Sequence, residues 1–313
     1  MGSGDESAGA LEWEEPSCLL CGGDRRSIVL ESPEKPVATT GPRPAVVRCD
    51  ACGFCYTCPR PTPASMQRFY PEDYWPHRLE SHANALKRRK WWARWFGSGW
   101  RPQRSLLRRQ KGRLLDFGCG GGKFLAEMHA EGWQVLGVDV SDSVVARIQE
   151  KLGLPVLAGD LSAPQLDQSS FEVITMRQSL EHVHDPREVL RQAHRLLVPG
   201  GTLLVWVPNF DSLAFRWFGP AWYGLDLPRH LVHFTPSTLR RIVAEAGFQV
   251  GPLSMVRHSS WLQRSAKRAR ELGRRGPQSR WLAWRAVCRW VTRYAFFTRQ
   301  SDCIALSATK PDD

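Results

Sequence analysis

The residues best suited to chemistry stand at the ends of three apolar runs. The first run, 113–117, contains Asp116 and leads into the glycine-rich segment 118–122. Asp139 ends the second run, and Asp160 follows the third. Glycine lets the backbone turn tightly and approach a ligand closely, and the N-terminus of a following helix offers free N–H groups. A strand-like run, a glycine turn and a helix therefore predict a site for a nucleotide-like ligand.

The three acids restrict which ligand can bind. A carboxylate at Asp139 can accept both hydroxyls of a ribose, and one at Asp160 can accept the exocyclic amine of an adenine. Asp116 would repel a pyrophosphate, but it suits a ligand with a positively charged amino group. Lys123 stands where G-x-G-x-x-G has its third glycine, and the segment is no Walker A motif. S-adenosylmethionine combines these features, although Asp139 or Asp160 alone could instead be a helix N-cap.

The elements that must position these acids alternate along the chain. Strand-like runs occupy 113–117, 134–138, 155–158, 171–176 and 202–207, with helical segments at about 122–131, 142–152, 186–197 and 236–246. A sixth strand is expected at 248–256, helices within 258–298 and a last strand at 302–310. Strands that alternate with helices predict right-handed crossovers and a parallel sheet covered on both faces.

These motifs together resemble a class I S-adenosylmethionine-dependent methyltransferase, over roughly residues 110–255 and the last strand. The resemblance rests on "LLDFGCGGG", "GVDVS", "AGD", "SLEHVHDP", "RLLVPGG" and "HFTPSTLRRIVAEAGF". It implies a Rossmann-like α/β fold with a seven-stranded sheet whose last strand is antiparallel. It also implies cofactor contacts from Asp116, Gly118, Gly120 and Gly122 to the methionine part, from Asp139 to the ribose, and from Asp160 to the adenine edge, with Val140 and Leu161 beside the adenine ring.

Methyl transfer from a sulfonium requires an aligned acceptor and, for a hydroxyl or a carbon acid, removal of its proton. Histidine suits that role near neutral pH. His182 follows the fourth strand-like run, and the segment "DLPRHLVHF" supplies Asp226, His230 and His233. We take His182, His230 and His233 as catalytic candidates. His182 can instead be structural, and His233 can pack inward.

The end of the fourth run also excludes a class of substrate. It reads "TMRQSLEH" and lacks the Asn/Asp-Pro-Pro-aromatic signature of methyltransferases that act on planar amino nitrogens. Adenine N6 and glutamine-type acceptors are therefore not expected. His184 precedes Asp185-Pro186, which is typical of a helix start, so it is expected only to neighbour a cap.

Residues 17–60 carry two C-x-x-C-Gly motifs. Their cysteines, Cys18, Cys21, Cys49 and Cys52, have the spacing of a zinc ribbon, and the glycines permit the tight turns that aim backbone N–H groups at thiolates. Cys55 and Cys58 extend the second motif to a cysteine at every third position, so an iron–sulfur cluster is the alternative. With no secretion signal in this sequence, a reducing compartment is the default expectation.

The net charge of +12 is concentrated in two segments. Lys87–Lys111 holds ten Lys or Arg and no acid, and Arg257–Arg299 holds twelve against Glu271. In the second segment Trp281, Trp284, Val287, Cys288, Val291 and Tyr294 are expected on one helical face. That face can pack on the core, lie on an anionic membrane surface or contact nucleic acid.

The sequence divides into four regions. We expect a disordered tail at 1–16, the zinc-ribbon-like segment at 17–60, a linker with basic helices at 61–110, and the methyltransferase domain at 111–313 with an inserted helical region at 258–298. No stretch reaches the length of a membrane span, so a cytoplasmic protein, peripheral at the membrane, is expected.

The order of cysteine motifs, "FYPEDYW" and methyltransferase core is similar to that of methyltransferases from sugar-nucleotide, surface-glycan and natural-product pathways. That similarity implies a small-molecule acceptor, a sugar or a lipid-linked or membrane-proximal metabolite, methylated on oxygen or carbon. An RNA methyltransferase and a non-catalytic scaffold that binds S-adenosylmethionine are the alternatives. The acceptor atom and the oligomeric state are not specified.

Overall fold

The computed structural model describes residues 11–33, 41–70, 107, 111–274, 276–282 and 284–312. Most of the predicted linker at 61–110, with nearly all of its basic segment, lies outside the described residues, as do residues 1–10 of the predicted tail. Within the described part, no helix is both long and apolar enough to cross a membrane.

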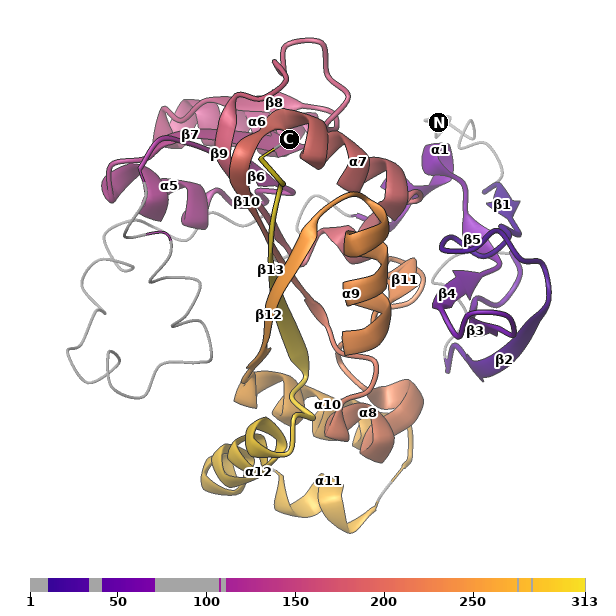
Figure 1. Ribbon diagram of the computed structural model, residues 1–313. Coiled ribbons are helices and arrows are strands. Elements are labelled where there is room, and N and C mark those ends of the chain that lie inside the picture. The colour runs from indigo at the N-terminus through magenta and orange to yellow at the C-terminus, as the bar shows by residue number, and fades with distance from the viewer. Residues whose placement is uncertain are drawn as a thin grey trace, which may run out of the picture.

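A seven-stranded sheet forms the centre of the fold (Figure 1). Its strands, in spatial order, are β12 (Gln249–Val256), β13 (Cys303–Thr309), β10 (Leu197–Pro208), β9 (Phe171–Arg177), β6 (Arg113–Phe117), β7 (Gln134–Asp139) and β8 (Val156–Ala158). Strands β6 to β10 run parallel, and β13 runs antiparallel to both of its neighbours. The predicted Rossmann-like α/β sheet, with an antiparallel last strand, is therefore confirmed.

The helices between these strands begin and end at residues that suit helix termini. They are α5 (Lys123–Ala130), α6 (Asp142–Leu152), α7 (Pro186–Leu196) and α9 (Pro236–Glu245), with the short η3 (Leu180–His182) before α7. The Asp185 side chain accepts the Glu188 N–H at the start of α7, and Thr235 and Thr238 form a capping box at the start of α9. Each of these two helices has proline at its first position, where the missing N–H costs nothing. His184 therefore neighbours a cap, as expected, but it also lines a cleft of the protein and its Nε2 lies 2.9 Å from the carbonyl of Pro61.

The cysteine-bearing segment shares a sheet with the methyltransferase region. Strands β2 (Arg26–Glu31), β3 (Ala45–Cys49) and β4 (Cys55–Cys58) form an antiparallel sheet whose fourth strand, β11, is Val232–His233. Figure 1 shows this module beside α9, with β11 between them. The segment predicted at 17–60 thus folds as part of a larger unit, not as an appendage.

Residues 11–16 correct the predicted tail. Trp13–Glu14 forms strand β1, which pairs antiparallel with β5 (Arg60–Pro61). The Glu12 N–H donates to Ser65 Oγ in the short helix α1 (Pro63–Met66), which is followed by η1 (Gln67–Phe69). The tail prediction was wrong for these residues because acidic composition alone does not reveal a strand partner almost fifty residues away in sequence.

One hydrophobic core crosses the boundary between the cysteine module and the main sheet. Phe54 and Tyr56 are fully buried together with Leu231 and Phe234. The rings of Phe54 and Phe234 meet edge to face with centroids 5.9 Å apart. A module of this size buries too little apolar surface to be stable alone, and the shared core supplies the remainder.

The helices predicted within 258–298 are present as α10 (Ser259–Glu271), α11 (Pro277–Trp281) and α12 (Arg285–Phe297), and they pack with α8 (Leu213–Phe218) and η4 (Gly219–Ala221). Their arrangement corrects the predicted apolar face. Leu282 and Cys288 are buried, but Trp281, Trp284 and Tyr294 are 67%, 72% and 60% exposed. The helix is interrupted between α11 and α12, so the six predicted residues do not follow a single helical periodicity.

The shared sheet predicts that Thr57 couples the stability of the two parts. Its hydroxyl donates to the carbonyl of His230 at 2.6 Å and lies 3.0 Å from Nε2 of His233. Thr57→Val keeps the shape but leaves both groups buried without a partner, so the free energy of unfolding should fall by about 1–3 kcal/mol. Urea denaturation, with Thr57→Ser as the control that keeps the hydroxyl, checks this. Equal stability of the Val and Ser variants would contradict it.

Candidate active site

A cleft of about 1370 Å³ lies at the carboxyl ends of the central parallel strands. Six of the eight predicted cofactor residues line it: Asp116, Gly118, Gly120, Asp139, Val140 and Asp160. Two of the three predicted catalytic residues, His182 and His230, line its other half. The carboxyl ends of parallel strands meet at one edge of a sheet, which is why side chains far apart in sequence gather there.

We call the part of the cleft lined by the six predicted cofactor residues the cofactor half, and the part lined by His182 and His230 the acceptor half. Asp116 is the buried acid of the cofactor half. It is 2% exposed, and its Oδ1 accepts the hydroxyl of Thr175 at 2.5 Å from the neighbouring strand β9. Burial raises the pKa of Asp116 to about 6. At neutral pH it is therefore predominantly a carboxylate, in a position suited to a cationic amino group.

Asp139 holds the glycine loop against the end of β7. Its two carboxylate oxygens accept the Gly120 N–H at 2.9 Å and the Ser141 N–H at 3.1 Å. The N-cap of α6 is Ser141, so Asp139 is not a helix cap. Gly118 has φ +70°, and an added Cβ there would lie 2.5 Å from Cβ of Ser179. The loop therefore needs glycine at 118 for both conformation and space.

Asp160 closes a turn after β8. Its Oδ1 accepts both the N–H and the hydroxyl of Ser162, at 2.8 and 2.5 Å. This turn leads to no helix before β9, so the alternative of an N-cap fails here too. Val140, predicted beside the adenine ring, is 67% exposed and lines the cleft.

Two predicted cofactor residues lie behind the cleft wall. Leu161 is 1% exposed and packs in the core. Gly122 is the left-handed N-cap of α5, and a Cβ there would crowd Leu152 and Ile148 at 3.0–3.2 Å. Gly122 thus allows α5 to approach α6, and the structure does not bring either residue to the surface of the cleft.

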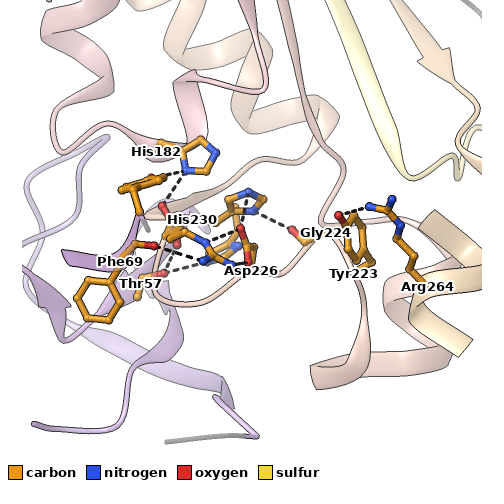
Figure 2. Close-up of polar contacts among 11 residues, drawn as sticks. Thr57, Phe69, His182, Tyr223, Gly224, Asp226, His230 and Arg264 are labelled. Atoms are coloured by element: carbon orange, nitrogen blue, oxygen red, sulfur yellow. Dashed lines mark hydrogen bonds and ion pairs between the residues drawn. The ribbon is translucent and has the colours of Figure 1, made fainter. Parts of the chain in front are cut away.

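His182 and His230 form the centre of the acceptor half, where their rings meet edge to face with centroids 4.6 Å apart (Figure 2). Nδ1 of His182 donates to the carbonyl of Arg229 at 3.0 Å and lies 2.9 Å from Tyr70 Oη. Nδ1 of His230 donates to the carbonyl of Gly224 at 2.9 Å. Because carbonyl oxygens only accept, both neutral rings keep the proton on Nδ1 and a lone pair on Nε2.

Burial keeps these imidazoles neutral. It lowers the pKa of His182 to about 3, and it also lowers that of His230. His230 Nε2 lies 3.9 Å from the carboxylate of Asp226, which in turn accepts from the Arg229 guanidinium. Burial opposes ionisation of Asp226, but the Arg229 hydrogen bond prevails and lowers its pKa. One ion pair therefore lies beside two neutral bases (Figure 2).

Glu181 is a further titratable group beside these histidines. It is fully buried, and neither carboxyl oxygen has a hydrogen-bond partner within the described residues. Burial raises its pKa to about 8, so the carboxyl is mostly protonated at neutral pH. Glu181, His182 and His230 each bring one ligand-type atom within 4.8 Å of the other two.

His233 lies outside the cleft, as the inward-packing alternative predicts. It is 3% exposed on β11, its Nε2 lies 3.0 Å from Thr57 Oγ1, and its ring packs 5.2 Å from that of Phe210. Burial lowers its pKa to about 3. A catalytic role for His233 would require contact with the acceptor, which this position does not provide.

Two residues of the acceptor half were not predicted from the sequence. Tyr70 comes from the C-terminal end of η1, beyond the cysteine module, and Arg229 precedes His230. Arg229 also donates to the carbonyl of Phe69, so it joins the two segments. The aromatic motif "FYPEDYW" was a visible signal for Tyr70, but nothing local indicated that it would reach His182.

The four predicted zinc ligands lie together. The sulfurs of Cys18, Cys21, Cys49 and Cys52 are all within 4.8 Å of one another. Gly22 and Gly53, with φ +74° and +75°, form the left-handed turns of the two motifs. A hydrogen bond from the Gly23 backbone lowers the pKa of Cys21 to about 7, which favours a thiolate.

Cys55 and Cys58 do not belong to this cluster. Both lie on β4 and are buried, Cys55 among apolar residues of the helical region and Cys58 in the shared core. Within the described residues, the cysteine cluster thus consists of one C-x-x-C pair from each of two motifs that are distant in sequence. The consecutive run that suggested an iron–sulfur cluster does not form one site.

Comparison with known proteins agrees with this geometry. A model of a methyltransferase domain matches residues 87–252, more than half of the chain. Ubiquinone biosynthesis O-methyltransferase from Pseudomonas aeruginosa (strain LESB58) is 33% identical over 163 residues, which cover 48% of this chain and 69% of that protein. The protein of the same name from Xanthomonas euvesicatoria pv. vesicatoria (strain 85-10) is 32% identical over 167 residues, which cover 49% of this chain and 69% of that protein.

Solved structures with a similar fold include an S-adenosylmethionine-dependent methyltransferase from Mesorhizobium loti, at 21% identity and a TM-score of 0.46, covering 69% of this chain and 99% of that one. The [4+2]-cyclase SpnF has 24% identity and a TM-score of 0.46, covering 68% and 81%. With the family match, the strand order and the acids at the strand ends, the chain belongs to the methyltransferase-domain family and is a class I S-adenosylmethionine-dependent methyltransferase.

Proposed function

We propose that this enzyme methylates a hydroxyl oxygen of a small-molecule acceptor and that His182 removes the hydroxyl proton. The observation that carries the proposal is the pair of neutral imidazoles, with Nδ1–H held by backbone carbonyls, in the half of the cleft opposite the cofactor acids. The names of the relatives, ubiquinone biosynthesis O-methyltransferases, support oxygen as the methyl acceptor.

The residues of the cofactor half fit S-adenosylmethionine. The Asp116 carboxylate suits the ammonium group of the cofactor. Because position 118 has no room for a Cβ, the loop presents bare backbone there. The carboxylates of Asp139 and Asp160 can accept hydrogen bonds from the ribose hydroxyls and the adenine amine. When bound, the cofactor supplies a methyl group on a positively charged sulfur, which needs no further activation. This chain then has to align the acceptor and manage one proton.

His182 is the more accessible of the two bases. Its side chain is only partly buried, whereas His230 is 7% exposed. Nε2 of His182 takes the proton from the hydroxyl of the methyl acceptor. The ring of His230 packs against the His182 ring and so fixes its orientation. The carboxylate of Asp226 stabilises the imidazolium that forms, and Glu181, neutral at pH 7, adds no competing charge.

The narrower class of acceptor is a sugar or a lipid-linked metabolite. The mouth of the cleft supports an amphiphilic molecule because Tyr223 and Trp261 line it, with ring centroids 5.6 Å apart. The guanidinium of Arg264 lies over the Tyr223 ring and contacts its hydroxyl (Figure 2). Aromatic walls contact both sugar faces and apolar chains, and a cation beside them suits an anionic carrier.

The four-cysteine cluster is proposed to hold one structural zinc ion. Four sulfurs from two knuckles, with left-handed glycines, match the donor set of a closed tetrahedral site. A bound ion would tie the 18–21 turn to the 49–52 turn and so stabilise the module that supplies β4 and precedes Tyr70 in the chain.

The raised pKa of Asp116 predicts pH-dependent cofactor binding. Above about pH 6 the carboxylate attracts the ammonium group, and below it protonation removes that attraction. The Kd for S-adenosylmethionine should therefore rise by up to about tenfold for each pH unit below 6. Calorimetric titration between pH 5 and pH 8 checks this. Asp116→Asn should bind weakly at every pH, whereas the exposed control Asp167→Asn should follow the wild type. A flat wild-type profile would contradict the prediction.

Removing the proposed base should separate catalysis from cofactor binding. His182→Gln is expected to lower kcat by about 10²–10⁴-fold, with the Kd for S-adenosylmethionine unchanged. Release of S-adenosylhomocysteine with diphenols, sugar nucleotides and lipid-linked sugars measures this, with the exposed His129→Gln as control. Cofactor binding without turnover on any acceptor would favour the scaffold alternative, and turnover on RNA alone would favour an RNA methyltransferase.

Metal analysis of the purified protein should find one zinc per chain. Cys21→Ser should lose the ion and lower the melting temperature, because the module loses its cross-link. Cys55→Ser, which changes a cysteine outside the cluster, should keep the ion. Full zinc content in Cys21→Ser would refute the assignment. A second equivalent that disappears in His230→Asn would locate an additional cation at Glu181, His182 and His230.

A further inference from the structure

Five large aromatic side chains project from α11, from α12 and from Trp284, which directly precedes α12. Trp281, Trp284, Trp290, Tyr294 and Phe297 are 60–79% exposed, and they make up most of the large hydrophobic side chains exposed within the described residues. We call these five residues the aromatic stripe. An exposed apolar surface of this kind is typical of a site that contacts another protein or a membrane.

The stripe is not needed for the core, since α12 packs through a different face. Cys288, Thr292 and Ala295 are buried on that face, and α12 packs there against α10. Trp290, Tyr294 and Phe297 follow at i, i+4 and i+7, so they form one line along the outer side of the helix. Figure 1 shows α8, α10, α11 and α12 gathered at one end of the molecule.

Positive charge accompanies the stripe. Residues 277–299 contain five arginines and no acid: Arg280, Arg285, Arg289, Arg293 and Arg299. The Arg293 guanidinium lies over the Trp290 ring, 5.9 Å from its centroid. The partner must therefore accept both apolar rings and a local charge of +5.

We propose that the aromatic stripe docks the enzyme on an anionic lipid bilayer. Trp and Tyr favour the boundary between head groups and acyl chains, and the flanking arginines pair with lipid phosphates. A symmetric contact with a second copy would place five arginines against five others, which opposes association. Nucleic acid would satisfy the arginines, but a line of exposed rings that includes Phe297 adds apolar surface that a phosphate backbone does not cover.

The position of α10 connects this surface to the cleft. The same helix that packs against α12 carries Trp261, near its N-terminal end, into the lining of the cleft. In a docked enzyme, the helical region that touches the bilayer would also carry Trp261 in the lining of the cleft. The docking proposal depends only on the exposed surface, so it does not depend on which acceptor atom is methylated.

Flotation with lipid vesicles tests the proposal on the full-length, zinc-loaded protein. Vesicles of phosphatidylcholine with phosphatidylglycerol should bind the protein, and vesicles of phosphatidylcholine alone should bind it weakly. Trp290→Gln, Tyr294→Gln and Phe297→Gln together should weaken binding by about tenfold or more, since binding scales with buried apolar area. The matched control is Ile28→Gln, which replaces an exposed hydrophobic residue on β2, outside the helical region, and should bind like the wild type.

A charge variant separates the two contributions. Arg289→Glu with Arg293→Glu should abolish the preference for anionic vesicles, whereas Arg240→Glu on α9 should not. Unchanged affinity for S-adenosylmethionine in every variant verifies the fold, and it distinguishes failure of docking from failure of the enzyme.

Three results would overturn the proposal. One is no binding of cofactor-competent protein to anionic vesicles, and another is full binding by the triple variant. The third is self-association, or RNA binding, that the triple variant abolishes while vesicle binding persists.

Discussion

The pairing of β4 with β11 is the contact on which the acceptor half of the cleft depends. The Thr57 N–H donates to the carbonyl of Leu231, and the Leu231 N–H donates in turn to the carbonyl of Glu181. A continuous line of backbone hydrogen bonds thus runs from the cysteine module to the turn that carries His182. The module gains a core that it is too small to build alone, and the two catalytic candidates gain fixed backbones.

Burial, more than ion pairing, sets the charges in the two halves of the cleft. In the acceptor half it keeps His182 and His230 neutral and Glu181 protonated, and the Asp226 carboxylate partly offsets the weak basicity that burial imposes on His182. In the cofactor half Asp116 remains a carboxylate at neutral pH despite its raised pKa. The two environments suit the two tasks that we propose for them, attraction of a cationic cofactor and removal of a proton from an uncharged acceptor.

Much of this cleft could be predicted because its signals are local. The apolar runs and the acids that end them recur within a few residues, and a parallel sheet then necessarily gathers Asp116, Asp139 and Asp160 at one edge. Burial was harder to anticipate. Leu161 was expected beside the adenine but packs in the core, and His233 was a catalytic candidate but faces Thr57. A side chain's direction depends on its neighbours across the sheet, which no single stretch of sequence contains.

The sequence by itself determined the order of strands and helices, the glycine turn, the acids of the cofactor half and the two cysteine knuckles, because each depends on backbone preferences or spacing within a short segment. Only the tertiary structure decided that Tyr70 reaches His182, that Cys55 and Cys58 leave the cluster, and that the rings on α12 face outward. Thr57 and His230 are 173 residues apart in sequence. Contacts over such separations arise from packing of the whole chain, and packing selects among local possibilities that the sequence pattern leaves equal.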